Sequence, residues 1–175
     1  MKVRIERQAL AMIIASSIEH FAKETVGMLY GIRGSNSFMI NHTYPHSNAY
    51  RTEYSVLYER NGRNRVNGYF GRFLDVDLIG GFHSHTYFSQ QNMSLVISKE
   101  DKKEMCKKPS NIELILCIKE FEKNKAKEFV KNTIGGYVIG QNSKYKFNAG
   151  VFYTDVTNKG EKKIYHTKRA QLKLI

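Results

Sequence analysis

Two histidines separated by one residue are the first candidates for chemistry in this sequence. His83 and His85 end a short apolar stretch punctuated by Gly80 and Gly81, which predicts a buried strand. Side chains alternate between the two faces of a strand, so both imidazoles are expected on one face and Ser84 on the other. Two such imidazoles can bind one metal ion, but the pair alone also fits two hydrogen-bonded histidines without a metal.

A third candidate ligand lies in the stretch SKED, which follows the histidines along the chain. The spacing of Ser98 and Asp101 predicts a capping box at the start of a helix. Capping and metal binding are compatible, because a capped first turn would hold the Asp101 carboxylate rigidly. If that turn faces the strand end, two histidines and one carboxylate leave a fourth coordination position for water, as in catalytic zinc sites.

Hydrolysis by such a site would also require a base, and Glu24 is the candidate. It lies where a predicted helix passes into the apolar stretch TVGMLYG. A carboxylate at this place could take a proton from a water molecule and return it to a leaving amine. A solvated glutamate at a helix end is the alternative interpretation of the same residue.

Hydrophobic periodicity and turn signals place these residues on elements of both kinds. Upstream of the histidines the sequence predicts a short strand, a helix, two strands that form a hairpin, and a second helix, at 1–6, 7–23, 25–31, 37–47 and 66–77. From the histidines onward it predicts a strand, a helix, a strand and a β-rich end, at 77–85, 98–108, 111–121, 133–141, 144–156 and 162–172. Because helices and strands do not alternate regularly, we expect an α/β fold with a mixed central β-sheet flanked by helices.

Length and composition bound the class of protein. The chain has 175 residues, of which 41% are hydrophobic, and this predicts a single domain over residues 1–175. The sequence has no apolar run of ~18 residues or more, so we expect no membrane span. The two cysteines, Cys106 and Cys117, do not form a disulfide framework, and free thiols in a reducing cytoplasm are the expected state.

The charge balance leaves several kinds of partner open. The chain carries 28 Lys and Arg against 16 Asp and Glu, a formal net charge of +12. Such a charge permits binding to nucleic acid, to an anionic surface or to an acidic protein. The basic residues are dispersed and no nucleic-acid-binding motif is present, so a solvated basic surface is expected and nucleic acid is not expected as a partner.

Taken together, Glu24, His83-Ser84-His85 and Ser98-x-x-Asp101 resemble the JAMM motif of the MPN (Mov34/PAD) family of zinc metalloproteases. The matching stretches are ETVGMLYG, IGGFHSH and SKED, in the order and setting that the family shows. The resemblance covers residues 1–155, and the joint motif is far more specific than any of its parts. It implies a single MPN domain of the cytidine-deaminase-like kind.

The resemblance also implies a role for each residue. His83, His85 and Asp101 would bind Zn²⁺, Glu24 would be the general base, and Ser98 would hydrogen-bond the developing oxyanion. The implied activity is hydrolysis of peptide or isopeptide bonds, which can include removing or processing a ubiquitin-like modifier. The implied partner is a protein or peptide substrate, and a non-catalytic MPN-type interaction module is the alternative.

The sequence departs from the family pattern at two points beside the site. The family places seven residues between the second histidine and the serine, whereas twelve, TYFSQQNMSLVI, stand here. The proline that commonly follows the second histidine is Thr86. We therefore expect a longer loop beside the site, and we interpret it as a wall that selects an extended substrate chain.

Overall fold

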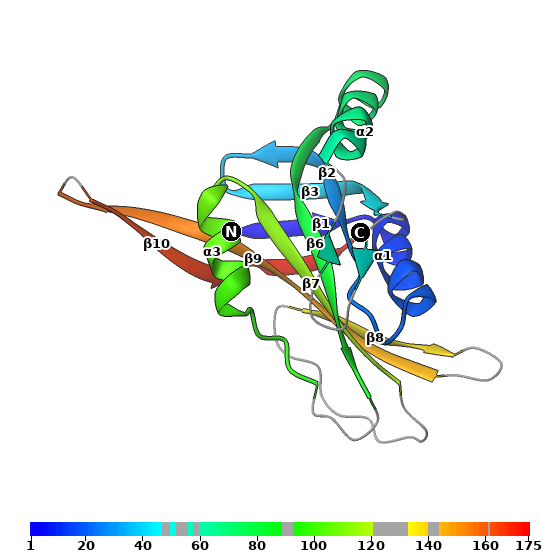
Figure 1. Ribbon diagram of the computed structural model, residues 1–175. Helices are drawn as coiled ribbons and strands as arrows, with labels where there is room; N and C mark the ends of the chain where they lie inside the picture. The colour runs from blue at the N-terminus through cyan, green and yellow to red at the C-terminus, as the bar shows by residue number, and fades with distance from the viewer. Residues whose placement is uncertain are drawn as a thin grey trace.

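The computed structural model describes residues 1–46, 50–51, 56–57, 60–88, 93–120, 133–139, 144–160 and 162–175. Its centre is a nine-stranded sheet in the order β10-β9-β7-β6-β2-β3-β1-β11, with β8 paired to β9 (Figure 1). The strands are β1 Lys2–Ile5, β2 Val26–Gly34, β3 Ser37–Pro45, β6 Asp77–Tyr87, β7 Ile112–Glu120, β8 Ile134–Ile139, β9 Lys144–Lys159, β10 Lys162–Arg169 and β11 Gln171–Leu174. The helices are α1 Arg7–Glu19, α2 Arg60–Phe73 and α3 Lys99–Lys107, and the short strands β4 Tyr50–Arg51 and β5 Val56–Leu57 pair with each other.

The prediction of an α/β fold with a mixed sheet is confirmed. β1 pairs in parallel with both β3 and β11, and β6 pairs in parallel with β7. The remaining pairs of the large sheet are antiparallel, including the predicted hairpin of β2 and β3. A parallel neighbour requires a crossover connection, and α3 lies within the one that joins β6 to β7.

The two ends of the strand order lie close together in space. β10 ends at Arg169 and β11 begins at Gln171, so only the buried Ala170 separates them along the chain. The Ala170 backbone N–H donates to the Val151 carbonyl of β9, and β11 contacts both β8 and β9. The sheet therefore curls strongly until its first and last strands are joined by one residue.

Each face of the curled sheet has its own apolar cluster. The larger cluster packs Leu10 and Ile13 of α1 against side chains such as Phe82 and Leu114. The smaller cluster lies under α3 and contains Met105 together with its neighbours Leu95, Ile97, Ile115, Cys117 and Phe152. α1 and α3 therefore cover opposite faces, and alternate residues of β6 and β7 face one helix or the other.

Two predicted elements were wrong in extent. α2 begins at Arg60 and ends at Phe73, whereas the periodicity predicted a helix over 66–77. The segment predicted as one strand over 162–172 forms two, because the chain leaves β9 at Ala170 and joins β1. In the part of the chain that the structure describes, no helix is long and apolar enough to cross a membrane.

Candidate active site

β6 presents His83 and His85 on the face covered by α3. His83 lies opposite Ile115 and His85 opposite Cys117 in the parallel pairing with β7, and both of those partners belong to the cluster under α3. Residues that lie opposite each other in neighbouring strands share a face. The prediction that the two imidazoles share one face, with Ser84 on the other, is therefore confirmed.

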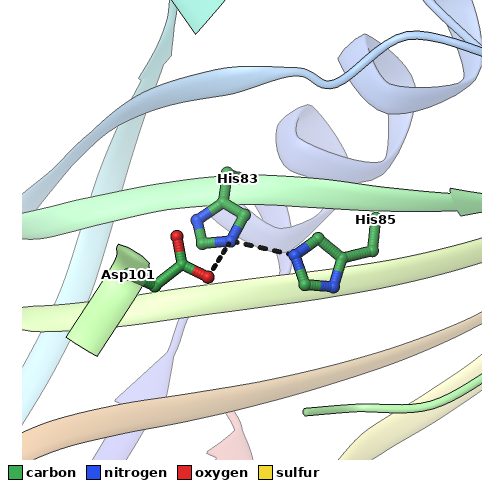
Figure 2. A group of neighbouring side chains, drawn as sticks. All are labelled: His83, His85 and Asp101. Atoms are coloured by element: carbon green, nitrogen blue, oxygen red, sulfur yellow. Dashed lines mark hydrogen bonds and ion pairs between the residues drawn. The ribbon is translucent and has the colours of Figure 1, made fainter. Parts of the chain in front are cut away.

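The two imidazoles and the Asp101 carboxylate converge on one point (Figure 2). The Nε2 atoms of His83 and His85 are 3.2 Å apart, and His83 Nε2 is 3.6 Å from Asp101 Oδ2. All three ligand atoms lie within 4.8 Å of one another. The long spacer before Ser98 thus leaves Asp101 within reach of the histidines.

The first turn of α3 fixes Asp101 as the capping box predicted. The Asp101 N–H donates to Ser98 Oγ at 3.0 Å, and the Ser98 N–H donates to Asp101 Oδ2 at 3.1 Å. The Ser98 hydroxyl also donates to Oδ2, at 2.6 Å. The oxygen that faces His83 therefore accepts two hydrogen bonds from the residue at the helix start, which restricts its position.

Glu113 is a site residue that the sequence interpretation missed. Its Oε1 is 2.8 Å from Nδ1 of His83, on the side of the ring away from Asp101 and His85. A carboxylate in this position fixes the orientation of the imidazole and the tautomer that leaves Nε2 available to a ligand. The signal was present, since Glu113 is the single acid in the apolar stretch NIELILCIK, but it matches no motif.

The pairing of β6 and β7 explains how Glu113 reaches His83. Glu113 lies opposite Gly81, two residues before His83 on the same face. A Cβ atom at Gly81 would come 2.9 Å from one Glu113 carboxylate oxygen and 3.5 Å from the other. The glycine therefore leaves the space through which the Glu113 carboxylate crosses to the imidazole.

Glu24 lies between α1 and β2, beside the end of β6. The next residue, Thr25, exchanges two hydrogen bonds with Ser84: its N–H donates to Ser84 Oγ at 2.9 Å, and its carbonyl accepts from the Ser84 N–H at 2.8 Å. Thr25 and Ser84 are both fully buried. The middle residue of the His-Ser-His stretch thus fixes the segment that carries Glu24.

Ser84→Ala tests this attachment. The variant leaves the Thr25 N–H buried without its partner, so we expect the free energy of unfolding to fall by about 1–3 kcal/mol. Denaturant unfolding followed by circular dichroism measures the change, and the exposed Ser110→Ala serves as the matched control. Equal stability of Ser84→Ala and the parent protein would contradict the attachment.

A cavity of about 380 Å³ opens beside the converging side chains. Glu24, His83 and Asp101 lie along its wall, and Gly81 and Met28 contribute to it from the sheet. α3 adds Glu104, Met105, Lys107 and Lys108, and Arg63 enters from α2. A substrate segment in this cavity would therefore contact the carboxylate of Glu24 and the two ligand candidates at once.

The electrostatics of the site separate its two histidines. Burial of the His83 ring opposes protonation, but hydrogen bonds to Asp101 and Glu113 outweigh it and raise the pKa of His83 to about 10. Burial and the neighbouring His83 charge lower the pKa of His85 to about 4. Burial also raises the pKa of the Asp101 carboxyl, but the hydrogen bonds with His83 and Ser98 outweigh it and hold this pKa well below its usual range.

Glu24 has the opposite tendency to Asp101. Burial raises the pKa of the Glu24 carboxyl, against the opposing effect of His83. A carboxylate with a raised pKa is a stronger base and exchanges protons closer to neutral pH. The two carboxyl groups are therefore suited to different roles, Asp101 to remaining ionised and Glu24 to moving a proton.

The donor set fits a zinc ion. Zinc sites combine imidazole nitrogens and carboxylate oxygens at about 2.0–2.2 Å, so neighbouring ligand atoms of a tetrahedral site lie about 3.3 Å apart. The separations of 3.2 Å and 3.6 Å between the ligand atoms of His83, His85 and Asp101 match that spacing. Glu113 adds the carboxylate that zinc-binding histidines usually contact through their other nitrogen.

The twelve-residue spacer is more ordered at its ends than a free loop would be. Thr86 and Tyr87 extend β6, and the Tyr87 hydroxyl donates to the Ser94 carbonyl at 2.8 Å. Leu95 and Ile97 are buried under α3. Residues 89–92, including Gln90 and Gln91, lie outside the described residues, so the predicted substrate wall stays a prediction.

Comparison with known proteins supports the fold alone. No family model matches the sequence, and no curated protein matches it. Among solved structures, the solution structure of protein DSY2949 from Desulfitobacterium hafniense is similar, with a TM-score of 0.59 and 16% sequence identity. The match covers 99% of this chain and 92% of that one. The chain therefore shares its overall architecture with DSY2949.

Proposed function

We propose that this chain is a zinc-dependent hydrolase of peptide or isopeptide bonds, and that its domain is an MPN domain of the JAMM type. The observation that carries the proposal is the meeting of His83, His85 and Asp101 beside a cavity that Glu24 also lines. These residues come from β6, α3 and the segment before β2, and the chain brings them together despite a spacer five residues longer than in the family it resembles.

The proposed roles follow from the position of each group. A bound zinc ion supplies a Lewis acid for the scissile carbonyl and lowers the pKa of a water molecule towards ~7. His83, His85 and Asp101 would hold the ion, and Glu113 would keep the His83 ring in the orientation that exposes Nε2. Glu24 would accept a proton on its carboxylate and return it to the leaving amine.

Ser98 has two proposed roles that use the same hydroxyl. In the structure this hydroxyl donates to Asp101 and stabilises the ligand. As a donor to the oxyanion it would turn from the carboxylate towards the substrate, a type of contact worth about 3–4 kcal/mol in other hydrolases. The capping bond from the Asp101 N–H accepts on Ser98 Oγ and does not depend on where the hydroxyl proton points.

The substrates that suit this chemistry are amides, either within a peptide or between a side-chain amine and a chain end. A ubiquitin-like conjugate is the proposed protein substrate, and it rests on the resemblance of the motif. A non-catalytic MPN-type module is the alternative, and it would require Asp101 to be displaced from the histidines. The separation of 3.6 Å between His83 and Asp101 favours the hydrolase.

Zinc binding and metal removal test the proposal. We expect metal-free protein to bind one zinc ion per chain, and we expect a chelator to abolish amide hydrolysis until zinc is restored. Isothermal calorimetry with the metal-free protein and zinc measures the stoichiometry, and quenched-fluorescence peptides measure hydrolysis. A folded protein that binds no zinc would refute the proposal, whereas zinc binding without hydrolysis would favour the non-catalytic module.

The pH dependence of zinc binding follows from the pKa of His83, which is about 10 in the metal-free protein. The imidazole is therefore protonated at pH 8, and a metal ligand must give up that proton. Zinc binding should release about one proton per ion, and the affinity should fall as the pH is lowered. Calorimetry in buffers of different ionisation enthalpy measures the number of protons released.

A further inference from the structure

The outer face of α2 exposes two large aromatic side chains. Tyr69 is 54% exposed and Phe73 is 72% exposed, although both belong to a regular helix. Their rings stack on each other, with centroids 5.2 Å apart and an interplanar angle of 15°. Exposed apolar side chains gathered at one place are typical of a surface that binds a partner.

The inner face of the same helix attaches it to the domain. Phe70 stacks on the buried Tyr30 at a centroid distance of 4.0 Å, and the Tyr30 hydroxyl donates to Asn67 at 2.7 Å. Arg63 lies on the wall of the cavity that contains Glu24. α2 is therefore fixed by one face while the other faces outward, and in Figure 1 the helix stands out from the sheet at the top.

The charges of α2 define the chemistry of its partner. The segment 60–73 contains four arginines and no acidic residue, and Asp75 and Asp77 come only after the helix. Arg65 and Arg72 flank a shallow hollow above Gly68, where an added Cβ would meet nothing within 4 Å. This face therefore fits an acidic surface that carries an exposed apolar side chain.

We propose that the outer face of α2 docks the folded, acidic part of a protein substrate while the end of that substrate's chain enters the cavity. The docking face consists of Arg65, Gly68, Tyr69, Arg72 and Phe73. The inference rests on the proposed function, because it assigns this face to the substrate of the same site. Arg63 links the two, since it lies in the cavity and belongs to the helix that carries the docking face.

The arrangement of the rings favours a protein over a nucleic acid. Bases bind by stacking on open aromatic faces. Tyr69 and Phe73 already stack on each other, which leaves no room for a base between them. Arginine beside exposed aromatic side chains is also the composition of energetically dominant positions in protein–protein interfaces.

The test measures binding of a folded acidic ubiquitin-like protein to zinc-loaded Glu24→Gln protein. Binding is followed by calorimetry, so the measurement does not depend on hydrolysis. The double variants Tyr69→Ala/Phe73→Ala and Arg65→Glu/Arg72→Glu should each weaken binding at least about tenfold, and added salt should weaken the parent's binding. Ile139→Ala is the matched control for the aromatic pair, since Ile139 is also 72% exposed but lies on β8, and Lys173→Glu on β11 is the control for charge.

Kinetics separate this inference from the proposed function. With otherwise unmodified protein, a short peptide carrying a fluorogenic C-terminal amide should be cleaved equally by the parent and both α2 variants. The same peptide at the end of the acidic domain should show a raised KM in the variants alone. No hydrolysis of either substrate would refute the proposed function. Absence of domain binding, equal binding by the α2 variants, or binding of a mixed-sequence oligonucleotide at this face in place of the domain would overturn the docking proposal.

Discussion

Glu24→Gln should retain one zinc ion per chain and lose about 10²–10⁴-fold in kcat. The amide has the shape of the carboxylate but cannot take up a proton at neutral pH. Glu24 is not one of the three converging ligand candidates, so its replacement leaves the donor set of His83, His85 and Asp101 intact. Zinc content by elemental analysis and turnover of a quenched-fluorescence peptide measure the two halves of this expectation.

Glu104→Gln is the matched control for this variant. Glu104 lines the same cavity from α3, but it is exposed and forms an ion pair with the exposed Lys107. Its replacement removes the same charge from the same cavity, and we expect turnover close to that of the parent. Full activity of Glu24→Gln, or an equal loss in both variants, would exclude Glu24 as the proton carrier.

Glu113→Ala should weaken zinc binding about 10–100-fold, although Glu113 is not itself a ligand candidate. The variant removes the carboxylate 2.8 Å from His83 Nδ1, so the ring is no longer held with Nε2 towards Asp101. Competition with a chromophoric chelator measures the affinity, and the absorption spectrum of the cobalt-substituted protein reports the geometry of the ligands.

Two further variants define what the Glu113 carboxylate contributes. Glu113→Gln keeps an oxygen that can accept from Nδ1–H, so its affinity for zinc should lie between those of the parent and Glu113→Ala. Glu120→Ala, at the other end of β7, should bind zinc as the parent does. Parent-like affinity in a folded Glu113→Ala protein would show that the contact does not orient His83.

Local patterns predicted most of the elements that carry the site. The alternation of side chains along β6 placed both histidines on one face, and the capping box placed Asp101 in the first turn of α3. Both depend only on residues close in sequence. The start of α2 was missed because the segment from Arg60 to Arg65 contains Asn, Gly and Arg and no apolar residue, so it has no hydrophobic period.

The remaining parts of the site depend on register, which a single sequence does not contain. Glu113 contacts His83 only because β7 lies parallel to β6 with Glu113 opposite Gly81. Ser84 likewise meets Thr25 through contacts between segments 59 residues apart. The packing of Leu95 and Ile97 under α3 was also missed, because their alternation was attributed to a loop.

The pairing of β1 with β11 has a consequence for how the chain acquires its structure. β1 carries residues 2–5 and its neighbour carries residues 171–174, so the two strands are synthesised at opposite ends of a ribosome's passage. Until the last of these residues emerges, β1 has one open edge, and the core lacks Ala170 and Leu172. Contacts of such sequence separation form late and slowly. Completion of the sheet therefore follows translation, and a nascent chain with its open edge is the form most exposed to mispairing with other strands.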